Sequence, residues 1–461
     1  MFRNSSSSTA VRELPGPSGW SLVGTFAQLL RRDLLKPFGN LFEKYGPLFR
    51  IPLPLGHNLV VIAHPDAVEL VLRSRQENYP KGSVYDGARL LLGSGLVTNE
   101  GESWRYQRAL ASPAFRPAKL EQYLTTMGVC TRERVVSWMS RGVRVRIDAH
   151  AEMTRLTMAI ATQTLFGLDI SEQSERAGRV FDTALAAIGR RGPAGLQVPL
   201  LLPTPGNVRF RRALRESDSI VYDIVRRFRS GQAEHPEQTL LGAYLAARDP
   251  ETGERMSDRQ LRDEIVTLYL AGHETTASLL TWALYWLARR PDIADRVTSE
   301  VDGFIGDDSP KSGDLKALQY TGRFVSEVLR LYPPAWTIAR NAVAEDVVLG
   351  YRIPAGAIVM LSPYLAHRWE AVWPDPLRFD PDRFTPDAVK ERHPFAYFPF
   401  SLGSRICIGM QFSLLEARLV LALILRQFRA QPVDGREIGC VAAGTLRPQQ
   451  GILIDLIPRR Q

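Results

Sequence analysis

The sequence predicts a mainly α-helical protein with a minor β region. Apolar residues recur at helical spacing from Glu102 to about Arg290, with breaks at prolines and at the segment Gly192–Gly206. Inside this region the pattern predicts one helix of about 34 residues, on the order of 50 Å long. Strand signals are short and few by comparison, so helix is expected to predominate.

The N-terminal part is expected to begin with an irregular tail, residues 1–19, rich in serine, glycine and proline. A hairpin is predicted next, because Gly46–Pro54 and Asn58–Ala63 have strand composition and a short turn separates them. Pro65–Arg73 should start as a helix, since proline is favoured in a first helical turn. Lys81–Glu100 is rich in glycine and lacks periodicity, which predicts a flexible loop.

The long central helix has the clearest ends. Ser257 and Gln260 form a capping-box pattern at its start, and Pro291 should stop it. Its segment Ile265–Ala288 is long enough to span a membrane, but Glu274 lies at the centre, where a charge is costly in lipid. The expectation is therefore a helix buried in a globular protein, and a chain that works in the cytoplasm.

The C-terminal part is predicted to contain further helices and three recognisable regions. These are a strand-and-turn region over Val347–Met360, a proline-rich coil over Pro374–Pro399, and a final helix from about Met410 to Phe428. The apolar segment Gly192–Gly206 has two interpretations that stay open. It either covers an entrance or contacts a partner, or it packs on the core.

Composition narrows the possible functions. The chain has 461 residues, 45% of them apolar and 23% charged, which is typical of a globular protein. Its length alone would suggest three domains. The net charge is +9, but no run of five basic residues occurs, so a nucleic-acid partner has no support. Three widely spaced cysteines, Cys130, Cys407 and Cys440, exclude a disulfide framework and a zinc module.

Cys407 is the residue with the strongest chemical pattern around it. It lies between Gly403 and Gly409, just before the predicted final helix, and Arg405 is nearby. Glycines allow a backbone loop to approach a flat group closely, and a helix N-terminus favours a thiolate. Taken alone, a single cysteine is more often an inert core residue.

The residues Phe400, Gly403, Arg405, Cys407 and Gly409 together resemble the heme-binding loop of the cytochrome P450 family. The resemblance implies heme b (iron protoporphyrin IX), with Cys407 as the axial thiolate ligand of the iron. Such a ligand favours O–O bond cleavage. The resemblance extends from about Trp20 to Pro458. It implies one cytochrome P450 domain over 1–461, with a long central helix over a buried heme, in place of three domains.

Three further motifs resemble the same family, in the family's order. In the central helix, Ala271 and Gly272 are small residues that would let heme and oxygen lie against it, and Glu274 and Thr275 match the family's oxygen-activation motif. A carboxylate and a hydroxyl there suit a relay of protons. The catalytic assignment is Thr275 and Glu274.

The other two motifs imply roles around the cofactor. Glu327 and Arg330 match a family pair that Arg383 completes, and a structural role is expected for all three. Trp104 and Arg108 match a motif that reaches a heme propionate. Buried carboxylates favour charge-assisted partners, so further propionate ligands are expected: Arg340 and Arg405.

The resemblance implies a bacterial-type monooxygenase that hydroxylates a lipophilic molecule with O₂. Two electrons should come from a ferredoxin and a ferredoxin reductase, because the chain has no separate nicotinamide or flavin domain. A terpenoid, polyketide or similar specialised metabolite is the expected substrate, with fatty acid second. The alternatives are a peroxide-driven P450, a heme isomerase, or a heme-binding protein without turnover.

Segments that match the family's substrate-contacting positions are mostly small or apolar. The expected substrate contacts are Tyr85, Leu268, Leu270, Ala335, Trp336, Thr337 and Thr445. A monomer is expected. A basic surface should favour an acidic ferredoxin through long-range attraction.

Overall fold

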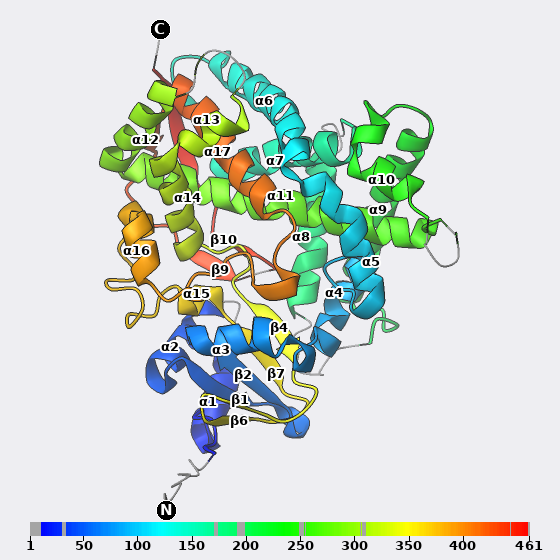
Figure 1. Cartoon of the computed structure of the whole chain (residues 1–461), viewed down its shortest axis with the longest axis vertical. Coiled ribbons are helices and arrows are strands. Elements are labelled where there is room, and N and C mark those ends of the chain that lie inside the picture. Colours follow the sequence, from blue (N-terminus) through cyan, green and yellow to red (C-terminus); the bar gives the residue numbers. More distant parts are fainter. Residues whose placement is uncertain are drawn as a thin grey trace, which may run out of the picture. The chain divides into compact units, whose positions relative to one another are not determined.

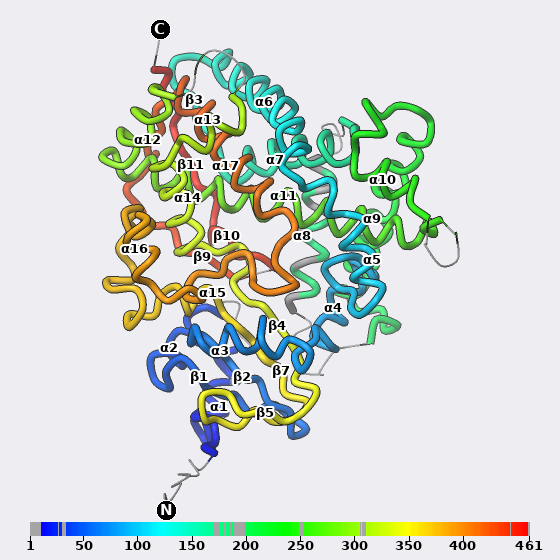
Figure 2. Tube along the Cα trace, in the orientation of Figure 1, coloured from blue at the N-terminus to red at the C-terminus, as the bar shows by residue number. Residues whose placement is uncertain are grey.

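The computed structural model describes most of the chain, namely residues 11–29, 34–169, 174–190, 199–248, 253, 255–304, 306, 310–442 and 444–459. Two compact units are formed. The smaller one ends its first segment at Val84 and continues with Trp336–Arg378 and Lys390–Ile406. The larger one comprises Tyr85–Ala335, Phe379–Val389 and the segment from Cys407 onwards. Figures 1 and 2 trace both.

The smaller unit is built on a four-stranded sheet of order β1-β2-β7-β4. Its strands are β1 (Leu48–Pro52), β2 (Asn58–Ile62), β7 (Ile358–Leu361) and β4 (Ile338–Asn341). β1 and β2 are antiparallel and pair Leu48 with Ile62, which confirms the predicted hairpin. β2 and β7 run parallel and β7 and β4 antiparallel, so strands from distant parts of the chain lie side by side, blue and yellow in Figure 1.

Short elements complete the smaller unit. The helices are α1 (Gly19–Leu29), α2 (Leu35–Tyr45), α3 (Pro65–Glu69) and α15 (Pro363–Ala366), and a two-stranded sheet consists of β5 (Asp346–Val348) and β6 (Tyr351–Ile353). α16 (Pro386–Glu391) follows later in the chain. The predicted proline-rich coil is thus interrupted by α16. Pro65–Arg73 starts as a helix, as the sequence predicts, and a turn of π-helix continues it from Leu70 to Ser74.

The larger unit is mostly helical. Its helices before the central one are α4 (Asp86–Leu92), α5 (Gly101–Ala111), α6 (Pro117–Met139), α7 (Ala149–Phe166), α8 (Ser174–Arg190), α9 (Pro205–Arg229) and α10 (Leu240–Ala246). The later ones are α12 (Pro291–Phe304), α13 (Ser312–Ala317), α14 (Gln319–Leu331) and α17 (Met410–Gln427). The final helix is therefore where the sequence predicts it.

The central helix, α11, spans Asp258–Arg289 and is buried over most of its length. Ser257 and Gln260 form the predicted capping box, and the helix ends just before Pro291, which starts α12. α7 packs along α11, as Figure 2 shows. Among the residues that the structure describes, no helix has the length and apolar character needed to cross a bilayer.

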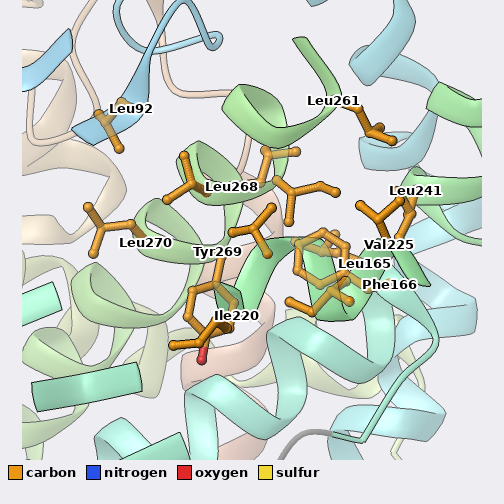
Figure 3. Packing of buried hydrophobic residues seen from close by; sticks show 14 of the residues in the cluster. Leu92, Leu165, Phe166, Ile220, Val225, Leu241, Leu261, Leu268, Tyr269 and Leu270 are labelled. Atoms are coloured by element: carbon orange, nitrogen blue, oxygen red, sulfur yellow. The ribbon is translucent and has the colours of Figure 1, made fainter. Parts of the chain in front are cut away.

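The N-terminal half of α11 lies in a large apolar core. Leu268, Tyr269 and Leu270 pack there with buried side chains from α4, α7, α9 and α10 (Figure 3). α4 lies within the segment Lys81–Glu100, so the prediction of a flexible loop there is wrong for Asp86–Leu92. Leu91 and Leu92 are buried in this core. Tertiary packing therefore stabilises α4, although the local sequence does not predict a helix there.

Two small sheets of the larger unit were not expected. β3 (Val145–Asp148), β11 (Leu453–Pro458) and β8 (Phe428–Pro432) form one sheet, with β11 in the middle. β9 (Cys440–Ala442) and β10 (Leu446–Pro448) form an antiparallel hairpin. These strands are three to six residues long, too short for an alternating pattern to stand out.

Glu327 and Arg330 form a fully buried ion pair on α14. Arg330 donates through Nε to Oε2 at 2.6 Å and through Nη2 to Oε1 at 2.7 Å. Arg383 Nε lies 3.7 Å from Glu327 Oε1, and the backbone N–H of Asp380 donates to the same oxygen at 2.8 Å. The structure thus brings the three residues together, and these contacts attach the segment after Phe379 to α14.

Arg330→Met is expected to lower the free energy of unfolding by about 3–5 kcal/mol, because it leaves the Glu327 carboxylate buried without its main cation. Arg323→Met is the matched control. Arg323 pairs with Asp382 between the same two segments but is partly exposed, so a loss of about 0–1 kcal/mol is expected. Urea unfolding followed by circular dichroism measures both, and equal losses would contradict the assignment.

A second buried acid, Glu264 on α11, predicts a pH dependence of the protein's stability. Burial raises the pKa of Glu264 to about 7, although hydrogen bonds from the Leu96 backbone and Tyr244 oppose the shift. The folded protein therefore binds an extra proton between the usual glutamate pKa and about 7. Its stability falls as pH rises through that window.

In Glu264→Gln this contribution to the pH dependence should disappear. The urea midpoint of the unmodified protein is expected to fall more steeply between pH 5 and 8 than that of the variant. The exposed Glu237→Gln serves as control and should follow the unmodified protein. Parallel curves for all three proteins would show that Glu264 does not titrate in this range.

Candidate functional site

The loop before α17 crosses from one unit to the other. Phe400, Gly403 and Arg405 belong to the smaller unit and are partly buried, and the larger unit resumes at Cys407. Gly403 has a backbone φ of +67°, and a Cβ there would lie 2.1 Å from the carbonyl oxygen of Leu72. The need for glycine at 403 is thus explained by the chain's own backbone.

Gly409 is the residue that caps α17 at its N-terminus. A Cβ at this position would make ordinary contacts, 3.9 Å from Phe115 and 4.0 Å from Cys407 Sγ. The Gly409 backbone N–H donates a hydrogen bond to Cys407, which lowers the pKa of the thiol. Gly409 therefore acts on Cys407 through its backbone.

Cys407 differs from the other two cysteines in its surroundings. Its side chain is exposed, whereas Cys130 is buried and Cys440 is intermediate. Desolvation by the neighbouring protein nevertheless raises the pKa of Cys407, against the lowering effects of the Gly409 N–H and of Arg108. The Gly409 N–H at the helix N-terminus thus acts on the pKa of Cys407 in the direction that the sequence predicts, while desolvation acts against it.

An accessible but poorly hydrated thiol fits a metal ligand. A bound cation would supply the favourable charge that the protein alone does not provide. No group of three His, Cys, Asp or Glu side chains in the described part of the chain can hold a metal. Heme iron fits this setting, because the ring supplies most of its ligands.

The middle of α11 carries an accessible strip in an otherwise buried helix. Ala271 is exposed, and Gly272 and Thr275 are partly exposed. The Thr275 hydroxyl donates to the Ala271 carbonyl at 2.8 Å. Its oxygen keeps lone pairs that can accept a hydrogen bond. A small residue on an open strip also fits a flat group that lies against the helix.

Glu274 is buried and hydrogen-bonded to the β9–β10 hairpin. Thr445 Oγ1 donates to Glu274 Oε1 at 2.5 Å, and Arg447 donates to the same oxygen through Nε at 2.9 Å and through Nη2. Arg447 was not among the site residues predicted from the sequence. It stands two residues after the predicted contact Thr445, in β10, and Thr445 lies just before that strand.

The predicted propionate ligands are one indole and three guanidinium groups, and they differ in burial. On α5, Trp104 is buried, and desolvation lowers the pKa of Arg108. In the smaller unit, Arg340 on β4 is 5% exposed, and its guanidinium donates to the carbonyl of Ala339 at 2.7 Å. A buried guanidinium with a single local acceptor among the described residues suits a carboxylate ligand.

The predicted substrate contacts have different environments. Leu268 and Leu270 are buried in the core, Tyr85 is partly buried and Ala335 is exposed. In the smaller unit, Trp336 packs on Phe38 with ring centroids 6.2 Å apart, and Thr337 is partly buried. Thr445 already donates a hydrogen bond to Glu274.

In the apolar loop predicted over 192–206, residues 192–198 lie outside the described chain, and Leu201 and Leu202 are exposed.

Gly403→Ala is expected to reduce the yield of heme-loaded protein, because the new methyl group meets the Leu72 carbonyl and the positive φ is strained. Gly356→Ala is the control. Gly356 has a φ of +75° but nothing within 4 Å of its Cβ position, so it tests strain without the clash. Heme content per protein, from absorbance and a pyridine hemochrome assay, should fall clearly in the first variant alone.

Comparisons of the sequence and of the structure with known proteins point to the same family. The family model Cytochrome P450 matches residues 14–454. A cyclooctat-9-en-7-ol 5-monooxygenase of Streptomyces melanosporofaciens is 36% identical, covering 91% of this chain and 90% of that protein. A pentalenene oxygenase of Streptomyces avermitilis is 33% identical, covering 96% and 97%. The solved heme domain of cytochrome P450DA has a TM-score of 0.86 and 28% identity, with 98% of each chain covered.

Proposed function

Because this chain belongs to the cytochrome P450 family and is a monooxygenase with heme b on the Cys407 thiolate, we propose that it hydroxylates a terpenoid. The names of two relatives carry the proposal, since one acts on cyclooctat-9-en-7-ol and another on pentalenene. The apolar character of Leu268, Leu270 and Ala335, as proposed substrate contacts, agrees with such a substrate.

The pairing of Arg447 favours a terpenoid over a fatty acid. A fatty acid held at depth needs a cation for its carboxylate. Arg447 is the one cation next to the proposed contact Thr445 among the described residues of β9 and β10, and Glu274 already neutralises it. A polyketide or another neutral specialised metabolite is compatible with the same contacts.

The residues that would hold the heme come from several elements. Cys407 would bind the iron, Ala271 and Gly272 would lie against the ring, and four side chains would meet the propionates: Trp104, Arg108, Arg340 and Arg405. Phe400, Gly403 and Gly409 would shape the loop. When bound, the heme supplies the activation of O₂ that thiolate ligation favours.

Thr275 and Glu274 are the proposed proton-handling groups. The Thr275 hydroxyl is fixed by its bond to Ala271 and can accept a hydrogen bond on its oxygen. Glu274 offers a carboxylate one residue away in a helix that excludes water elsewhere. When two protons are delivered in a controlled way, the O–O bond is cleaved. Without that control, hydrogen peroxide is released instead.

The electrons are proposed to come from a ferredoxin and its reductase. The family implies an external donor, and the net charge of +9 favours an acidic one. A peroxide-driven reaction is the second candidate. The presence of both Glu274 and Thr275 favours the O₂-dependent reaction, because peroxide brings its own protons.

Spectral titration tests the substrate class. Pentalenene and cyclooctat-9-en-7-ol are expected to shift the heme Soret band at micromolar concentration, and dodecanoic acid is expected to bind more weakly. Turnover should need NADPH with a surrogate ferredoxin and reductase. Preference for dodecanoic acid would contradict the terpenoid assignment, and turnover with peroxide alone would contradict the electron supply.

Cys407→Ala should lack the thiolate band of the reduced carbon monoxide complex, while Cys130→Ala and Cys440→Ala retain it.

A further inference from the structure

The hydrogen bonds of Glu274 are distributed unevenly between its two oxygens. Oε1 accepts from Thr445 Oγ1 and from two nitrogens of Arg447, and no described residue donates to Oε2. The side chain of Glu274 is 7% exposed and that of Arg447 is 18% exposed. The carboxylate is therefore held tightly at one oxygen by Thr445 and Arg447, and within the described part of the chain it has no donor at the other.

The hairpin has other attachments that do not involve Glu274. The Ser278 hydroxyl of α11 donates to the Leu446 carbonyl at 2.7 Å, and the Leu446 backbone N–H donates to the Pro334 carbonyl at 2.9 Å. The Leu446 side chain is fully buried. These contacts hold β10 against α11 one helical turn beyond Glu274, so the ion pair is not the sole anchor of the strand.

A buried ion pair often adds little to stability, because desolvation of both charges offsets their attraction. Its better-supported use is to fix one geometry. Here Arg447 and Thr445 together hold Glu274 Oε1 with three donors, which come from β10 and from the residue just before it. This arrangement is poorly explained as a fold-stabilising contact and well explained as control of the carboxylate's orientation.

We propose that Arg447, with Thr445, is the positioning residue of the proton relay: it fixes Glu274 Oε1 so that protons are exchanged at Oε2. The inference rests on the proposed role of Glu274. A hydronium ion of the solvent gives a proton to Oε2 and leaves neutral water. Oε2 then passes that proton to the Thr275 oxygen while the proton already on that hydroxyl moves on to the oxygen being reduced, so both side chains return to their starting state. Arg447 stays protonated throughout, as guanidinium groups do in proteins, and no group of the relay is oxidised or reduced.

The position of the hairpin adds a consequence for substrate binding. Thr445 is a proposed substrate contact and also a donor to Glu274. A substrate that orders this end of the hairpin therefore also orders the carboxylate. The end of the hairpin at Thr445 would therefore affect both substrate binding and proton delivery. This link favours cleavage of O₂ when a substrate is bound.

The test compares five variants of the heme-loaded full chain. Arg447→Met removes the charge, Arg447→Lys keeps it without the forked donors, and Thr445→Val removes the hydroxyl. Glu274→Gln tests the relay itself. Ser278→Ala is the matched control, because it removes an anchor of the same strand to the same helix without touching the carboxylate.

Two quantities are measured. The first is the ratio of NADPH-derived electrons recovered in hydrogen peroxide to those recovered in product and water, with pentalenene and without it. This ratio is defined even if pentalenene is not turned over. The second is independent of activity: the carboxylate stretch of Glu274, taken as the infrared difference between the unmodified protein and Glu274→Gln.

In Arg447→Met the peroxide ratio is expected to rise about tenfold and the carboxylate band to shift, with a smaller change in Thr445→Val and partial recovery in Arg447→Lys. Ser278→Ala should leave both quantities unchanged. If Arg447→Met fails to take up heme, Arg447→Lys and Thr445→Val decide the question by the same two measurements.

Three outcomes would overturn the inference in distinguishable ways. A normal ratio in Arg447→Met, with a high ratio in Glu274→Gln, would show that Arg447 does not position the relay. An equal rise in Ser278→Ala and Arg447→Met would reduce Arg447 to an anchor of the hairpin. A normal ratio in Glu274→Gln would remove the proposed role of Glu274 itself.

Discussion

The structure depends on one constraint: α11 must be buried along most of its length and yet leave its middle accessible. The apolar residues of its N-terminal half pack against α4, α7, α9 and α10. At Ala271 this packing stops, and the helix presents a small exposed residue beside Gly272 and Thr275. An accessible strip in the middle of a core helix is where a large flat ligand can complete the packing.

Burial also affects two of the buried acids of α11, Glu264 and Glu274, and the thiol of Cys407. For Glu264 and Cys407, desolvation raises the pKa and favours the uncharged form. Glu264 finds no cation that offsets its burial, and it titrates near neutral pH. The Gly409 N–H and Arg108 oppose the desolvation of Cys407, and iron bound to its sulfur would add a further favourable charge. Glu274 instead has Arg447 directly on Oε1.

The sequence predicted the parts of the fold that are encoded locally. The capping box at Ser257, the stop at Pro291 and the hairpin that contains β1 and β2 each depend on a few adjacent residues, and the structure has all three. The helix α4 and the short C-terminal strands depend on packing partners far away in the chain. No local pattern distinguishes such segments from loops, and they were missed for that reason.

The same distinction applies to the candidate site, where motifs supplied residue types and the fold supplied their partners. Glu274 was chosen as a relay carboxylate from its place in the helix, and nothing near it in the sequence indicated an arginine 173 positions later. That arginine changes what the carboxylate can do. Arg447 and Thr445 hold one oxygen of that carboxylate and so fix its orientation beside Thr275 in the chain. The relay therefore depends on tertiary structure as much as on the motif, and relatives that share the motif need not share its proton-transfer properties.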